Sequence, residues 1–115
     1  MKDLKGKCLM NKTLSVMGLA RRAGKLIIGH DAVMLSVRNH RAKTVLLTSD
    51  ASQRHKRELE AADFDGATVN LLCTMKEAGF ATGKNSCIFA IEDDGFVKAI
   101  VKSLSEEGSE YGSKI

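Results

Sequence analysis

Thr44-Val45-Leu46-Leu47-Thr48 is the stretch of this sequence that decides its fold. The run is rich in residues that favour strands, and its centre is apolar without interruption. A strand with one face in water alternates apolar and polar residues, whereas a strand covered on both faces is apolar throughout. The run therefore predicts a strand inside a sheet that carries helices on both faces, as in an α/β protein.

Other short apolar runs and helical patterns alternate along the chain. Further strands are expected at residues 26–28, 67–71 and 87–91. Helices are expected where apolar residues recur every three or four positions: from Leu14 to a stop at Gly24, over about 31–39, 52–62 and 75–82, and from Asp93 to Leu104. The alternation supports the α/β prediction.

Polar side chains just before these helices are candidate N-caps. Asn11 or Thr13 is expected to cap the first helix, and residues 49–52 offer several oxygens for the third. The third helix is so rich in charged and polar residues that most of it is expected to face water.

The chain is 115 residues long with a mass of 12.5 kDa, which bounds it to one domain. Hydrophobic residues make up 43%, enough for a core without disulfides or a structural metal. Residues 1–10 are expected to form a flexible basic arm and residues 11–105 a single α/β domain. Residues 106–115 lack an apolar pattern, and we expect a disordered acidic tail there.

Charge is distributed unevenly along the sequence. Residues 1–57 hold 13 Lys and Arg against three Asp, whereas residues 58–115 hold five Lys and Arg against 11 Asp and Glu. Such asymmetry is typical of a protein that docks a polyanion with one side. Sampling noise in a small soluble protein is the alternative interpretation.

The cysteines and the hydropathy of the sequence indicate the cellular compartment of the protein. Cys8, Cys73 and Cys87 are odd in number and widely spaced, so free thiols in a reducing cytoplasm are expected. No apolar stretch is long enough for a membrane span, and the first residues lack an apolar signal core. We expect a cytoplasmic protein without a membrane partner.

Enzyme and cofactor motifs are absent from the sequence. Residues 79–84, Gly-Phe-Ala-Thr-Gly-Lys, superficially resemble a phosphate loop, but structural glycines are the favoured interpretation. His30, His40 and His55 have no His or Cys partner at helical spacing, so no metal is expected. The sequence predicts a non-enzymatic protein without a cofactor, and a small enzyme using a Cys or His remains a rival.

Cations at the end of the first predicted helix are the strongest binding signal. Arg21, Arg22 and Lys25 lie within five residues. They complement the helix dipole, and they are equally suited to contact phosphates. Gly29 then opens the second helix, whose free N–H groups favour an anion, and glycine permits close approach to the backbone.

Four segments carry a family resemblance, and each stands in the right order and spacing: residues 14–25, 29–33, 42–52 and 78–84. There the chain resembles the ribosomal L-seven-Ae / L-thirty-e family of kink-turn RNA-binding proteins, and it is most similar to the small bacterial YlxQ-like members. The resemblance covers about residues 11–104. It implies a three-layer α-β-α sandwich around a mixed, roughly four-stranded sheet.

The resemblance also implies an RNA site in two parts. One part is the turn into the second helix, where the family's Gly-x-Asn-Glu motif matches Gly29, His30, Asp31 and Ala32. The other part is the loop before the last strand, which corresponds to Lys84, Asn85, Ser86 and Cys87.

Two positions depart from the family motif. Asp31 stands where the family has Asn, and a carboxylate accepts hydrogen bonds but does not donate them. Ala32 stands where the family has Glu and offers neither function. We therefore expect weakened selectivity for kink-turns and retained binding of structured RNA through the basic half.

The sequence as a whole predicts a monomeric, non-enzymatic protein that binds structured RNA, either kink-turn-like or ribosomal, and that associates with ribosome or ribonucleoprotein components. Its predicted RNA-binding residues are Arg21, Arg22, Lys25, Gly29, His30, Asp31, Lys84, Asn85 and Ser86. A protein-interaction adaptor that kept the fold and lost kink-turn selectivity is the alternative.

Overall fold

The computed structural model describes residues 11–106, which form five helices and four strands. In chain order these are α1 (Asn11–Arg22), β1 (Leu26–Ile28), α2 (His30–Arg38), β2 (Thr44–Leu47), α3 (Gln53–Ala61), β3 (Ala67–Asn70), α4 (Met75–Thr82), β4 (Ile88–Ile91) and α5 (Asp94–Glu106). The predicted basic arm, and the predicted tail beyond Glu106, lie outside the described residues.

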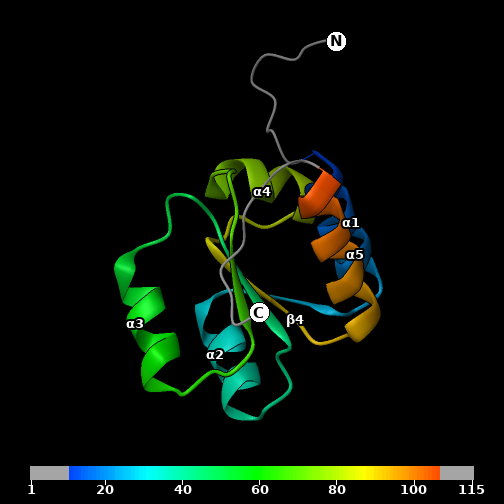
Figure 1. Ribbon diagram of the computed structural model, residues 1–115. Coiled ribbons are helices and arrows are strands. Elements are labelled where there is room, and N and C mark those ends of the chain that lie inside the picture. Colours follow the sequence, from blue (N-terminus) through cyan, green and yellow to red (C-terminus); the bar gives the residue numbers. More distant parts are fainter. Residues whose placement is uncertain (1–10, 107–115) are drawn as a thin grey trace.

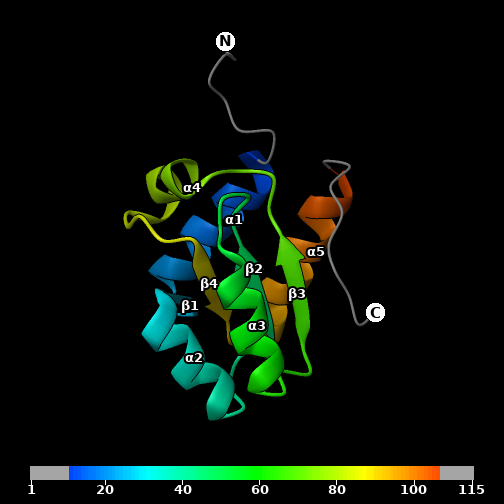
Figure 2. The ribbon, with the colours of Figure 1, turned by 90° about the vertical axis from the view of Figure 1, so that its left-hand side faces the viewer.

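The strands form one mixed sheet in the order β1-β4-β2-β3. β4 runs antiparallel to both of its neighbours, and β2 and β3 are parallel. Figures 1 and 2 show α2 and α3 on one side of the sheet and α1 and α5 on the other. The predicted three-layer α-β-α sandwich around a mixed four-stranded sheet is confirmed.

β2 divides its side chains between two cores, as its uninterrupted apolarity predicts. Leu46 belongs to the core formed with α1, α4 and α5. Val45 and Leu47 belong to the second core, which the sheet forms with α2 and α3. All four residues of β2 are buried, so the strand is covered on both faces.

α1 and α5 pack side by side, and a buried polar contact joins them. Thr13 Oγ1 lies 2.7 Å from Ser103 Oγ, which also donates to the Ile100 carbonyl at 2.8 Å. α1 begins at Asn11. The prediction of Thr13 as an N-cap is therefore wrong, because Thr13 lies inside the helix and its hydroxyl is satisfied across the interface.

Asp50 stabilises the start of α4 rather than that of α3. Its Oδ1 accepts from the Thr48 hydroxyl at 2.7 Å and from the Met75 N–H at 3.0 Å. These bonds hold the pKa of the Asp50 carboxyl below its ordinary value, the Thr48 bond having the larger effect. Ser52 occupies the N-cap position of α3 without a side-chain cap hydrogen bond.

The chain segments that precede β4 and that follow β1, β2 and β3 lie at the same end of the sheet. Because β4 opposes the other three strands, its amino end lies beside the carboxyl ends of β1, β2 and β3. The loop that precedes β4 consequently meets the turn into α2 and the loop that leads to α3. No helix within residues 11–106 is long and apolar enough to cross a membrane.

Two phenylalanines provide a matched test of the core. Phe89, on β4, is fully buried, whereas Phe80, on α4, is 82% exposed. We expect Phe89→Ala to lower the free energy of unfolding by about 3–5 kcal/mol, because it leaves a cavity. Phe80→Ala should change it by less than about 0.5 kcal/mol. Urea denaturation of both variants measures the difference, and comparable losses would contradict this description of the core.

Candidate nucleic-acid interface

Gly29 forms the turn between β1 and α2. Its φ of 101° lies in a region that side chains other than glycine rarely adopt, and its backbone holds the turn at both ends. The Gly29 N–H donates to the Ile88 carbonyl at 3.2 Å, and the Gly29 carbonyl accepts from Val33 at 2.9 Å. The first bond ties the turn to the amino end of β4.

His30 is held between two carboxylates. Its Nδ1 lies 2.9 Å from Asp31 Oδ1, and its Nε2 lies 2.6 Å from Glu58 Oε1 on α3. Carboxylate oxygens only accept, so the arrangement is satisfied best when both ring nitrogens carry protons. The two carboxylates therefore favour the imidazolium form of His30.

The pKa values in this cluster follow from these contacts. The hydrogen bonds that His30 donates to Asp31 and then to Glu58 raise the pKa of His30 above its ordinary value. The bond to His30 in turn lowers the pKa of Glu58. Desolvation, and then the charge of His30, lower the pKa of His55, whose ring centroid lies 5.5 Å from that of His30. The two histidines are thus shifted in opposite directions.

His55 also reaches the loop before β4. Its Nδ1 lies 3.6 Å from Cys87 Sγ. Burial raises the pKa of the Cys87 thiol, and the pKa of His55 is lowered, so neither group favours a thiolate–imidazolium pair. No group of three potential ligands for a metal ion is found among residues 11–106.

The loop between α4 and β4 carries the second part of the predicted site. Lys84 and Asn85 are exposed, and Ser86 is half-buried. The Ser86 hydroxyl donates to the Ile88 carbonyl at 2.8 Å, next to the Gly29 contact. Asn85 lies against α4 at Gly79, where a Cβ would overlap its amide oxygen. The loop is thus held against both β4 and α4.

Arg21 joins the end of α1 to this loop. A Cβ at Gly83 would lie 2.7 Å from an Arg21 guanidinium nitrogen, so the side chain passes directly over that glycine. Gly83 adopts the left-handed conformation that ends α4, with φ 86°, which supports the structural interpretation of the glycines in 79–84. Arg21, Arg22 and Gly83 line one shallow depression of about 370 Å³.

The predicted residues are not all brought together. Gly29, His30, Asp31 and the 84–86 loop meet at one end of the sheet, and Arg21 approaches that loop. Lys25 precedes β1 instead, and its carbonyl accepts from the Glu92 N–H at 3.3 Å, at the opposite end of β4.

Two residues of the cluster were missed by the sequence analysis. The sequence predicts that most of the helix carrying His55 and Glu58 faces water, yet Glu58 contacts His30 and His55 contacts Cys87. Their i, i+3 spacing puts them on one face of α3, which is the signal that could have grouped them. Nothing in the sequence indicates that this face turns toward His30.

Part of the basic half is neutralised elsewhere in the fold. Arg41 lies 4.0 Å from Glu92, and Lys43 lies 3.9 Å from Asp94. These pairs join the strongly basic segment to the acidic one, away from the Gly29 turn. The sequence asymmetry therefore overstates the cationic surface that is open to a partner.

The strand order, the helix layers and the turn beside the loop define an α-β-α sandwich of the L-seven-Ae type. A Giardia lamblia 15.5kD RNA binding protein has this fold, with a TM-score of 0.64 at 14% identity over 87% of this chain and 88% of its own. A protein with unknown function from Bacillus halodurans C gives a TM-score of 0.68 at 27% identity over 82% and 97% of the two chains. No family model matches the sequence.

Two relatives found by sequence similarity show to which family within this fold class the chain belongs. RNA-binding protein YlxQ of Enterococcus faecium is 34% identical over 88 residues, which cover 76% of this chain and 85% of that protein. RNA-binding protein YlxQ of Bacillus subtilis (strain 168) is 33% identical over 91 residues, which cover 77% and 91%. The chain therefore belongs to the YlxQ family, and the resemblance noted in the sequence is confirmed.

The opposite shifts of the two histidines predict their order of titration. By NMR, the midpoint of His30 should lie above 6.5 and that of His55 below it. Because the pKa of His30 is raised on folding, its contribution to stability is complete below pH 6.5 and is lost as pH rises through the higher, folded value. Glu58→Gln should lower the His30 midpoint. An unchanged midpoint would contradict the contact between the two side chains.

Proposed function

We propose that this protein binds structured RNA without catalysing a reaction, through the Gly29 turn, the 84–86 loop and the arginines at the end of α1. The observation that carries the proposal is the hydrogen bond from the Gly29 N–H to the Ile88 carbonyl. It places the start of α2 against the loop that precedes β4, so that two segments far apart in the sequence lie side by side.

Each part of this surface has a chemical role in the proposal. Arg21 and Arg22 hold phosphates, which supply most of the affinity and little of the sequence choice. Asn85 is an exposed residue whose amide both donates and accepts, as base edges require. His30 in its imidazolium form adds a cation between Asp31 and Glu58, which offsets the charge of carboxylates near phosphates.

The relatives support RNA as the partner, because both YlxQ proteins are named RNA-binding proteins. Within that class, we propose a kink-turn-like or ribosomal RNA element, ribonucleoprotein components as neighbours, and a cytoplasmic monomer. An adaptor that binds only protein is the alternative, and salt dependence separates the two, since only an RNA binder releases counterions on association.

The arginines should determine that salt dependence. Replacing Arg21 and Arg22 by Ala should weaken binding to a structured RNA and flatten the slope of log K against log salt by roughly two units, about 0.9 for each lost phosphate contact. Lys98→Ala with Lys102→Ala removes the same charge from exposed positions of α5 and is the matched control. Equal slopes for the two double variants would rule out the α1 surface.

Lys25 can be tested separately, because it lies at the other end of β4. Adding Lys25→Ala to the arginine variant should flatten the slope by about one further unit if the RNA spans the whole end of α1. If the slope of log K against log salt does not change further, the interface is restricted to Arg21 and Arg22.

Asp31 and Ala32 should limit selectivity for kink-turns. Asp31→Asn with Ala32→Glu should raise the preference for a kink-turn RNA over the same RNA with its G·A pairs replaced by Watson–Crick pairs. The Asn amide both donates and accepts, and the helix N-terminus tolerates the added carboxylate. Each well-placed base contact discriminates by about 1–3 kcal/mol in DNA complexes, so tenfold or more is expected from two. Strong discrimination by the wild type would place recognition elsewhere, on the 84–86 loop.

A further inference from the structure

Phe80, in the last turn of α4, presents its ring to water. Its exposed fraction is 82%, whereas Phe89 is fully buried and Phe64 and Phe96 pack against the two cores. Among the described phenylalanines, Phe80 is thus the one whose ring lies outside both hydrophobic cores. An aromatic ring of this kind is a common anchor for a partner.

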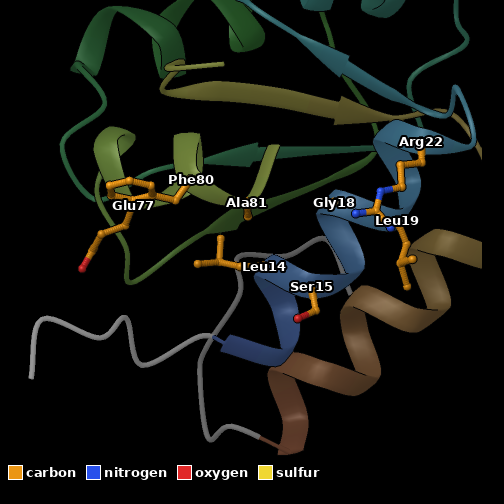
Figure 3. A pocket seen from close by; sticks show the side chains of 8 residues that line it. All are labelled: Leu14, Ser15, Gly18, Leu19, Arg22, Glu77, Phe80 and Ala81. Carbon is orange, nitrogen blue, oxygen red and sulfur yellow. The ribbon is translucent and has the colours of Figure 1, made fainter. Parts of the chain in front are cut away.

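The ring stands on the rim of a groove between α1 and α4. The groove has a volume of about 550 Å³ and is lined by Leu14, Ser15, Gly18, Leu19, Arg22, Glu77, Phe80 and Ala81 (Figure 3). The helices approach closely because Gly18 has no side chain: a Cβ there would lie 3.0 Å from the Ala81 carbonyl oxygen. Leu19, on α1, adds a second apolar side chain that is 53% exposed.

The groove continues into the proposed RNA site. The depression that contains Arg21 and Gly83 shares four residues with it: Gly18, Arg22, Phe80 and Ala81. From the rim at Phe80 the surface therefore passes Arg22 and Arg21 and reaches Gly83, which directly precedes the 84–86 loop. Apolar and cationic groups follow one another along this path.

The charge of the path favours an anionic occupant. Arg21 and Arg22 are both exposed, and Glu77 is the acidic residue among the described groove-lining residues. Glu77 Oε1 accepts from the Thr74 N–H at 2.8 Å and from the Thr74 hydroxyl at 3.3 Å, as part of the capping box that starts α4. Its carboxylate is thus committed to the helix start, away from the arginines.

We propose that Phe80 stacks an unpaired base that flanks the structured RNA, while Arg22 and Arg21 hold the phosphates that connect this nucleotide to the Gly29 turn. The inference rests on the proposed function. An aromatic face beside guanidinium groups matches a nucleotide, which joins a flat apolar base to an anionic phosphate. Phe80 carries the one aromatic ring among the described residues that line this path, so the surface accepts a single base without a choice of sequence.

A tryptophan substitution makes the stacking visible. The sequence contains no Trp, so Phe80→Trp introduces a single reporter. A kink-turn RNA that carries a short unpaired flank, added at either end, should quench its fluorescence, and the same RNA with blunt ends should not. Lys98→Trp is the control, since Lys98 is exposed on α5, which is not part of the proposed RNA surface. Equal quenching by flanked and blunt RNA, or at both positions, would overturn the proposal.

Affinities of the wild type and Phe80→Ala give the second measurement. Loss of a stacked base should weaken binding of the flanked RNA by about five- to a hundredfold and leave the blunt RNA unaffected. Phe80→Tyr should restore the wild-type affinity, because the ring face is kept. Equal affinities of wild type and Phe80→Ala for the flanked RNA would overturn the stacking proposal while the proposed function stands.

Two further outcomes would contradict the stacking proposal. If the wild type binds neither RNA, the proposed function and the stacking proposal both fail. If Phe80→Trp fluorescence changes with protein concentration in the absence of RNA, the groove receives a second copy of the chain and the stacking proposal is wrong.

Discussion

β4 pairs antiparallel with both β1 and β2, and all four of its residues are buried. Phe89 and Ile91 contribute to one core, and Ile88 and Ala90 to the other, so this strand is shared by both layers. Its direction also places the 84–86 loop at the end of the sheet where the turn into α2 begins. The geometry of the proposed RNA surface thus depends on the same strand that joins the two cores.

The insertion of β4 explains why the charge asymmetry of the sequence does not divide the molecule into a basic and an acidic half. β4 and α5 belong to the acidic segment, yet β4 lies between two strands of the basic one. Glu92 and Asp94, at the carboxyl end of β4, consequently pair with Arg41 and Lys43. At the other end, Arg21 of α1 lies over Gly83, which directly precedes the 84–86 loop and its exposed Lys84.

The elements could be predicted from the sequence because their signals are local. The strand at 26–28 and the helix at 75–82 were predicted with the observed bounds, and β2 was recognised from its uninterrupted apolar centre. Thr13 was misassigned because its partner, Ser103, lies 90 positions away. For the same reason the cluster of His30, His55 and Glu58 was not foreseen, since it arises only when α3 packs beside the turn into α2. Arg21, Arg22, Lys25 and Gly29 were predicted from the sequence pattern itself. The family resemblance added His30, Asp31 and the 84–86 loop, and the contact of all these residues with RNA stays a prediction.

α4 links the two surfaces that we assign to RNA. Its buried side carries Gly79, which leaves room for Asn85, and its end at Gly83 leaves room for Arg21. Its exposed side carries Phe80. Contacts of Thr74, Glu77 and Asp50 hold the start of α4. The helix can therefore present Gly79, Gly83 and Phe80 in fixed positions relative to one another. In the proposed RNA complex, α4 would therefore act through position, because Asn85 lies against Gly79 and Arg21 lies over Gly83 on the same helix that carries Phe80.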